Sequence, residues 1–124
     1  MISIKSAREI ELMREAGEKN ILCFKTLEKH IKPGITTDKI NKIVEDFLKK
    51  NDCISGTLGF EGYPKSVCVS VNDEVVHGIP GGRVLKDGDI VSVDLVLSYK
   101  GYHSNALTLS GTLPIIYVLV ASEW

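Results

Sequence analysis

The chain has 124 residues, of which 44% are apolar and 25% charged, and its formal net charge at pH 7 is −1. These values are typical of a folded globular protein and exclude a disordered chain. The near-zero charge provides no basic surface for nucleic acid or for an anionic membrane. We therefore expect a single domain over residues 1–124 with no nucleic-acid and no membrane partner.

The cysteines and the apolar runs indicate a cytoplasmic protein. Cys23, Cys53 and Cys68 are an odd number without C-x-x-C spacing, a pattern typical of free thiols in a reducing compartment. The N-terminus mixes charges with apolar residues, unlike a secretory signal. The longest apolar run, Ile115 to Ala121, is far shorter than the roughly 20 residues of a membrane helix, and we interpret it as a buried strand.

Two amphipathic helices are predicted in the first half of the chain. Ser6 begins a capping box, and apolar residues then recur every three or four positions until Pro33, where we expect the first helix to end. Thr36 or Thr37 can cap a second helix, which stops at Asn51. The apolar stripe of each helix is predicted to face the core.

Strands are predicted from Ser55 onward. Residues 66–71 alternate between apolar and polar side chains, which is the period of a strand. Asp89 to Tyr99, the turn at Lys100-Gly101 and Tyr102 to Leu109 indicate a β-hairpin. Helices followed by strands favour an α+β fold in which the two N-terminal helices pack on one face of an antiparallel sheet.

Asp94 lies in the middle of a predicted strand, where an apolar residue is expected. A buried carboxylate must be solvated at a cleft, paired with a cation or bound to a metal; otherwise Asp94 lies on the wet face of a half-exposed sheet. Whether the hairpin turn is flanked by Tyr99 and Tyr102 or by Leu97 and Tyr102, Asp94 and Asn105 share a face, roughly 5–8 Å apart. Two carboxylates there could hold two divalent ions, but an amide replaces a carboxylate poorly.

Histidines provide further candidate site residues. His77 ends a strand where a Gly/Pro loop begins, so it could donate a hydrogen bond to a substrate carbonyl; the alternative is a solvent-exposed residue at a loop edge. His103 shares the face of Asn105 and is a candidate supporting donor or weak ligand. His30, in the predicted last turn of the first helix, is explained by the helix dipole.

Three segments resemble type I methionine aminopeptidases. They are GYPKSVCVSVNDEVVHGIP at 62–80, KDGDIVSVD at 86–94 and the helix start at 4–17. The similarity extends from the N-terminus to about His103. It implies the first half of a pita-bread fold, in which two α+β halves surround two divalent metal ions (Co, Mn, Fe or Zn) and remove the initiator methionine from nascent proteins.

The resemblance also implies roles for individual residues. Asp94 would be a metal ligand and His77 would contact the substrate beside the scissile peptide bond. Phe60, Tyr63 and Cys68 would line an apolar pocket for the methionine side chain. Plain core packing is the alternative for these three residues.

Departures from the family pattern fall on the metal ligands. Where the family has His-Gly-Asp, this chain reads His103-Ser104-Asn105, so that Asn105 is an altered ligand position. Beyond it the chain has no histidine and only Glu123 as an acid, and residues 107–124 show no family feature. We expect this chain by itself to be inactive or severely impaired. The alternative is a truncated, non-catalytic relative that binds an N-terminal Met peptide or a protein partner, and an exposed sheet face would favour self-association.

Overall fold

The computed structural model describes the backbone of residues 6–74, 78–110 and 116–120, and side chains up to residue 104 within these ranges. Helices come first and strands follow, which confirms the predicted α+β order. The elements are α1 (Ala7–Glu28), α2 (Thr37–Lys50), β1 (Cys53–Ser55), the 3-10 helix η1 (Phe60–Gly62), β2 (Cys68–Val71), β3 (Val91–Tyr99), β4 (Tyr102–Ser110) and β5 (Ile116–Val120).

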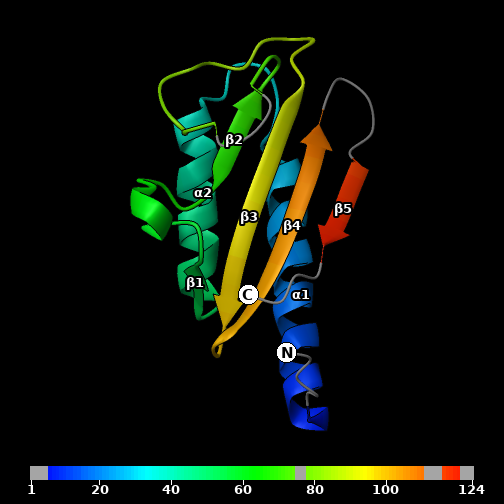
Figure 1. Cartoon of the computed structure of the whole chain (residues 1–124). Coiled ribbons are helices and arrows are strands. Elements are labelled where there is room, and N and C mark those ends of the chain that lie inside the picture. Colours follow the sequence, from blue (N-terminus) through cyan, green and yellow to red (C-terminus); the bar gives the residue numbers. More distant parts are fainter. Residues whose placement is uncertain (1–5, 75–77, 111–115, 121–124) are drawn as a thin grey trace.

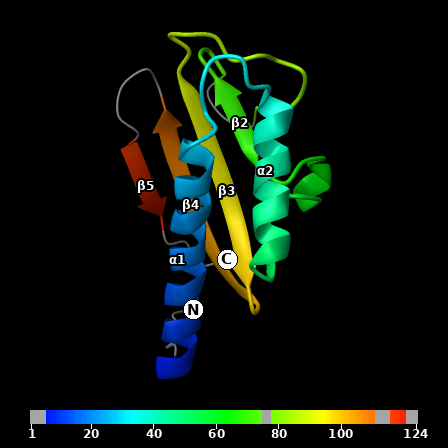
Figure 2. The same cartoon turned by 180° about the vertical axis from the view of Figure 1, so that it is seen from behind.

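The strands form one antiparallel sheet around β3. Strand β4 pairs along one side of β3, and β5 extends the sheet beyond β4. On the other side of β3, β1 and β2 pair with its two ends. The sheet lies in front of both helices in Figure 1, and the helices lie in front of the sheet in Figure 2. Both helices therefore cover the same face, as predicted.

Alternation along β3 separates the core from the uncovered face. The odd-numbered positions from Val91 to Leu97 are at most 3% exposed, whereas the even-numbered positions 92–98 are half-buried. The odd-numbered side chains belong to one apolar cluster with residues of both helices, including Phe24 and Leu27 of α1 and Val44 of α2. Asp94 therefore lies on the face that the helices do not cover.

Both predicted helix starts are confirmed by their capping bonds. The Ser6 side chain accepts a hydrogen bond from the Glu9 amide at 3.2 Å, and Thr36 accepts one from the Lys39 amide at 3.1 Å. Each bond satisfies an amide that has no partner within the helix. The second helix ends at Asn51, as predicted. Among the described residues, no helix is long and apolar enough to cross a bilayer.

The predicted end of the first helix was wrong. The helix ends at Glu28, before Pro33, and the amides of His30 and Ile31 both donate to the Leu27 carbonyl in a closing turn. The chain then pairs with residues 84–85, since the Gly34 amide donates to the Leu85 carbonyl at 2.8 Å. A hydrogen bond between residue 34 and residue 85 thus takes the place of the last helical turn that was predicted before Pro33. His30 lies after the helix, not in its last turn.

Strand boundaries also differ from the predictions. The prediction missed β1, a three-residue strand that follows the left-handed residue Asp52. The strand predicted from Ser66 begins at Cys68, because the Ser66 amide donates to the Asn41 side chain instead of to a strand. The strand predicted from Asp89 begins at residue 91, because the Asp89 amide closes a turn onto Lys86.

The C-terminal strands follow the predicted hairpin. Tyr99 pairs with Tyr102 across the two-residue turn, which selects the first of the two predicted registers. Lys100 and Gly101 have φ values of 50° and 84°, and a two-residue hairpin turn of this kind needs positive φ at both positions. The last predicted strand is confirmed for residues 116–120, and its predicted ends lie outside the described residues. Its predicted burial stays a prediction, because the structure describes no side chains there.

Candidate functional site

A cavity of about 760 Å³ lies where the loop from β1 to β2 meets the uncovered face of β3. We call it the β3 cavity. Its wall combines apolar and aromatic side chains with a few polar groups, which is the usual composition of a ligand pocket. The lining residues are Gly56, Thr57, Phe60, Glu61, Gly62, Tyr63, Pro64, Cys68, Ile79, Asp94, Val96 and His103.

Asp94 and Cys68 are neighbours in the cavity wall. The antiparallel register pairs Cys68 of β2 directly with Asp94 of β3, so both side chains leave the same face. Cys68 is 8% exposed and the Oδ1 atom of Asp94 is buried. A carboxylate and a thiol are therefore placed side by side on the uncovered face of the sheet.

Strand β4 brings the altered motif to the same part of the sheet. His103 pairs with Ser98, is exposed and lines the cavity. The backbone of Asn105 pairs with Val96, two positions from the partner of Asp94, and the Asn105 side chain lies outside the described residues. His77 also lies outside them, so its predicted substrate contact stays a prediction.

Two glycines let the loops pass close to the strands. A Cβ atom at Gly56 would lie 2.7 Å from Cγ1 of Val96, and one at Gly78 would lie 2.2 Å from the carbonyl oxygen of Val69. Both distances are shorter than real Cβ contacts, so a larger residue would push the loop away from the strand. Gly56 therefore fixes the distance between the loop and Val96.

Tyr63 is held in the cavity wall by its hydroxyl. The hydroxyl oxygen lies 3.1 Å from the Val67 carbonyl oxygen and 2.9 Å from that of Gly78, so it donates to the main chain. Burial raises the pKa of the Tyr63 phenol well above its usual range, and the neighbouring Cys68 and Asp94 raise it further. The ring therefore presents a neutral wall at physiological pH.

Cys68 is also neutral at physiological pH. Burial raises the pKa of its thiol, the hydrogen bond with Tyr63 lowers that pKa by less, and the charge of Asp94 raises it again. A thiol that keeps its proton behaves as a small apolar side chain and is a poor nucleophile. This environment favours contact with an apolar ligand group over thiolate chemistry.

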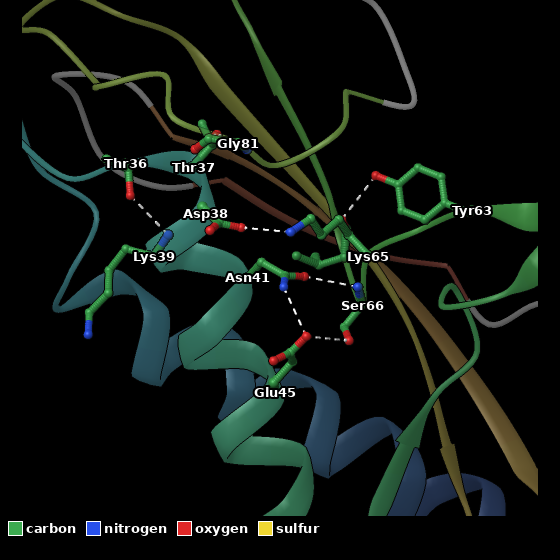
Figure 3. A network of polar contacts seen from close by, with 11 residues as sticks. Thr36, Thr37, Asp38, Lys39, Asn41, Glu45, Tyr63, Lys65, Ser66 and Gly81 are labelled. Atoms are coloured by element: carbon green, nitrogen blue, oxygen red, sulfur yellow. Dashed lines mark hydrogen bonds and ion pairs between the residues drawn. The ribbon is translucent and has the colours of Figure 1, made fainter.

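A polar network connects the loop between β1 and β2 to the first turns of α2 (Figure 3). Lys65 forms an ion pair with Asp38 at 3.0 Å. The Asn41 side chain accepts a hydrogen bond from the Ser66 amide at 2.9 Å and donates to Glu45 at 3.0 Å. The buried Asn41 thus satisfies a loop amide and a helix carboxylate together, which fixes the chain immediately before β2.

The same helix turn holds the loop after Gly78. The Thr37 hydroxyl accepts a hydrogen bond from the Gly81 amide at 2.9 Å, and the Asp38 amide donates to the Gly81 carbonyl at 2.9 Å. Figure 3 shows Thr37 and Gly81 on one side of this turn and Lys65 and Ser66 on the other. One end of α2 therefore positions both loops that contribute to the β3 cavity.

Each metal ion implied by the resemblance needs several ligand side chains that point toward the same ion. Within residues 6–74 and 78–104, no group of three or more His, Cys, Asp or Glu side chains is arranged to hold a metal ion. Asp94, with its buried Oδ1 atom, suits a single ligand position. The described side chains by themselves do not form a two-metal centre.

The cavity gathers five of the predicted site residues, namely Phe60, Tyr63, Cys68, Asp94 and His103. Phe60 is 53% exposed and Tyr63 is half-buried, so these two aromatic residues lie outside the core. Sequence reasoning gave no site role to the other seven lining residues, which are Gly56, Thr57, Glu61, Gly62, Pro64, Ile79 and Val96. Strand alternation could have found Val96, because it is two positions from Asp94 on the same face.

Comparisons with known proteins assign the family. The sequence model of metallopeptidase family M24 matches residues 11–108. Methionine aminopeptidase 1 of Bacillus subtilis (strain 168) is 51% identical over 106 residues, which are 86% of this chain and 43% of that protein. The crystal structure of methionine aminopeptidase from Rickettsia prowazekii matches 90% of this chain with a TM-score of 0.87 and 32% identity.

A second solved structure, the methionine aminopeptidase of Thermotoga maritima, matches 89% of this chain with a TM-score of 0.85 and 40% identity. Both matches cover 45% of the solved chain, so this chain spans less than half the length of these relatives. The predicted resemblance is thereby confirmed over most of the sequence. This chain belongs to metallopeptidase family M24, and it has the fold of the matching part of the pita-bread methionine aminopeptidases.

Proposed function

We propose that this chain binds the N-terminal methionine of peptides and nascent proteins in the β3 cavity, as the methionine-binding part of a metal-dependent aminopeptidase. One observation carries the proposal: the apolar wall and the carboxylate of Asp94 meet in a single cavity of about 760 Å³. An N-terminal methionine offers the matching groups, because its apolar thioether side chain and its cationic amino group leave the same carbon atom.

Each group of the ligand has a partner in the wall. Phe60 and Tyr63 offer aromatic surface, and sulfur contacts aromatic rings favourably. The neutral Cys68 leaves the side-chain pocket uncharged, while Asp94 beside it attracts the ammonium group. A ligand with a polar first side chain, or with a blocked amino group, lacks one of these two matches.

The family resemblance adds a reaction to this binding proposal, namely hydrolysis of the peptide bond after the methionine. By that resemblance, Asp94 would be a ligand of two divalent ions and His77 would contact the substrate beside the scissile bond. It assigns the other ligands to the altered position of Asn105 and to the part of the relatives' length that the match to this chain does not span. We therefore propose that the chain binds the substrate and that hydrolysis needs ligands from elsewhere. Nascent proteins are made in the cytoplasm, which is where we expect the chain to act.

A binding measurement tests the cavity. We expect Phe60→Ala to weaken binding of the peptide Met-Ala-Ser about fivefold in calorimetry, because loss of an aromatic contact costs about 1 kcal/mol. Ile90→Ala is the matched control, since Ile90 is 57% exposed against 53% for Phe60 and does not line the cavity. Equal affinities of the two variants, or no binding of the peptide by the unmodified chain, would contradict the proposal.

A turnover measurement tests the proposed need for further ligands. We expect no release of methionine from Met-Ala-Ser when manganese or cobalt is added to the purified chain. Asn105→Asp should not restore release, because one added carboxylate cannot complete a two-metal centre. Release by the unmodified chain would show that its own residues suffice for catalysis, and release by Asn105→Asp alone would show that the amide at this position is what blocks it.

A further inference from the structure

A second carboxylate, that of Glu61, lines the β3 cavity, and its residue is exposed to solvent. The other titratable side chains of the described lining are Tyr63, Cys68, Asp94 and His103, and no lysine or arginine is among them. The exposed part of the wall therefore carries negative charge. The charge of Glu61 has no role in holding an apolar methionine side chain.

The basic residue of the loop that contains Glu61 is paired elsewhere. Lys65 forms an ion pair with Asp38 of α2 at 3.0 Å. Within the described residues, the ion pairs of the structure do not include Glu61. Its charge is thus available to a ligand that enters the cavity.

The backbone holds Glu61 in an uncommon conformation. Its φ and ψ are 49° and 33°, in the left-handed region, and it lies between Gly59 and Gly62, which also have positive φ. Side chains other than glycine, asparagine and aspartate rarely adopt this region, and such residues cluster at ligand-binding sites. Glu61 therefore occupies a position that suits glycine better on conformational grounds alone.

The direction of a bound chain end would bring Glu61 near the residues that follow methionine. The free end must be inside the cavity, and the rest of the polypeptide must leave through its mouth. The buried Oδ1 of Asp94 marks the inner end, while Glu61 and the half-exposed Phe60 mark the mouth. An extended chain advances about 3.4 Å per residue, so the third residue lies about 7 Å beyond the methionine.

We propose that Glu61 makes the site prefer N-termini with lysine or arginine at the third position. The cationic group would pair with the Glu61 carboxylate, and the aliphatic stem would lie on the exposed ring of the adjacent Phe60. The inference rests on the proposed binding of N-terminal methionine. It adds a preference that depends on the sequence after the methionine, supplied by one residue of this chain.

Three matched peptides test the preference in the full chain. Met-Ala-Lys-Ser, Met-Ala-Gln-Ser and Met-Ala-Glu-Ser differ only in the charge of the third residue. At low ionic strength we expect the lysine peptide to bind about threefold more tightly than the glutamine peptide, and the glutamate peptide more weakly than both. The difference should shrink at high salt, because an exposed ion pair is screened.

Variants assign the preference to Glu61. Glu61→Gln should abolish the differences among the three peptides, and Glu61→Lys should reverse their order. Asp87→Asn is the matched control, because it also removes one exposed negative charge but lies outside the cavity lining, and it should keep the original order. The same order in Glu61→Gln as in the unmodified chain would overturn the inference, as would equal affinities of the unmodified chain for all three peptides.

The outcome also separates this inference from the proposed function. If the glutamine peptide binds no better than its Nα-acetylated form, the binding of a free N-terminal methionine fails, and the inference fails with it. If the glutamine peptide binds and its acetylated form does not, the proposed function stands. Equal affinities for the lysine, glutamine and glutamate peptides would then contradict only the preference assigned to Glu61.

Discussion

The two faces of β3 differ in what their side chains contact. On the helix side, Val93, Leu95 and Leu97 are fully buried in the apolar cluster. On the other side, Asp94 and Val96 line the β3 cavity. A single strand therefore supplies core packing at odd positions and the candidate site at even positions, and its pleat keeps the two sets of side chains apart.

This comparison shows why a carboxylate can stand in the middle of a central strand. Had Asp94 occupied an odd position, it would be buried among apolar side chains at a cost of several kcal/mol. At an even position it adjoins a cavity, where a cationic ligand or a metal ion can offset its desolvation. Substitutions on the two faces should therefore affect different properties: those on the helix side should lower stability, and those on the cavity side should weaken peptide binding.

The largest effect is expected from a cavity made in the core. Leu95→Ala should lower the free energy of unfolding by about 3 kcal/mol, because Leu95 is completely buried. Val96→Ala, the adjacent residue on the other face, should cost about 1 kcal/mol or less and act mainly on peptide binding. Urea denaturation of both variants measures the contrast. Equal losses of stability would show that the two faces do not divide as described.

A smaller effect is expected from a polar contact on the helix side. The buried Asn20 of α1 donates hydrogen bonds to the carbonyl oxygens of Leu95 at 3.3 Å and Ser104 at 3.0 Å, so it joins the helix to both hairpin strands. Asn20→Ala should cost about 2 kcal/mol of stability, because it leaves buried carbonyl groups without this donor.

A residue of the same helix provides the control for Asn20. Thr26 donates only to the carbonyl of Leu22 within α1, so Thr26→Ala should change stability by less than about 0.5 kcal/mol. Thermal unfolding of the two variants gives the comparison. If Asn20→Ala were as stable as Thr26→Ala, the hydrogen bonds between α1 and the hairpin would not stabilise the helix-covered face.

The smallest effect is expected at alkaline pH. Burial raises the pKa of the Cys23 thiol of α1 to about 12, and the charge of Cys53 adds to the increase. Between about pH 9 and pH 12 the unfolded chain loses this proton and the folded chain keeps it, so stability falls as the pH rises. Cys23→Ala should make the slope of the unfolding free energy about 1 kcal/mol per pH unit less steep between pH 9.5 and 11.

Denaturation at several pH values measures this slope independently of the packing change that the substitution causes. An unchanged slope would mean that the Cys23 thiol ionises as easily in the folded chain as in the unfolded one. Below about pH 7.5 the thiol is protonated in both states, so the free energy of unfolding no longer depends on its ionisation. The unmodified chain and the variant should then differ by a constant free energy.

Local sequence patterns predicted much of the fold. Ser6 and Thr36 begin the helices because their side-chain oxygens accept bonds from amides three residues later. The hairpin turn followed from Lys100-Gly101, and the period of β3 showed Asp94 to be out of place in a core strand. Each of these signals lies within a few residues, which is why it can be read without the structure.

Other features depend on contacts between distant segments. The end of α1 is set by pairing of residues 34–36 with 84–85, and β1 is too short to show a period. The ion pair of Lys65 with Asp38 and the left-handed Glu61 arise only when the loop folds against α2 and β3. Sequence reasoning therefore found the residues that match the family, but it missed the charged mouth of the cavity.

The two loops that line the β3 cavity are already held in place by the end of α2, and the Tyr63 hydroxyl is bonded to the main chain of both. A ligand would therefore meet a ring whose rotamer is already selected, and binding would not have to restrict it. The entropy lost on association would come chiefly from the peptide. A conformationally restricted N-terminal methionine mimic should for this reason gain affinity over a flexible one.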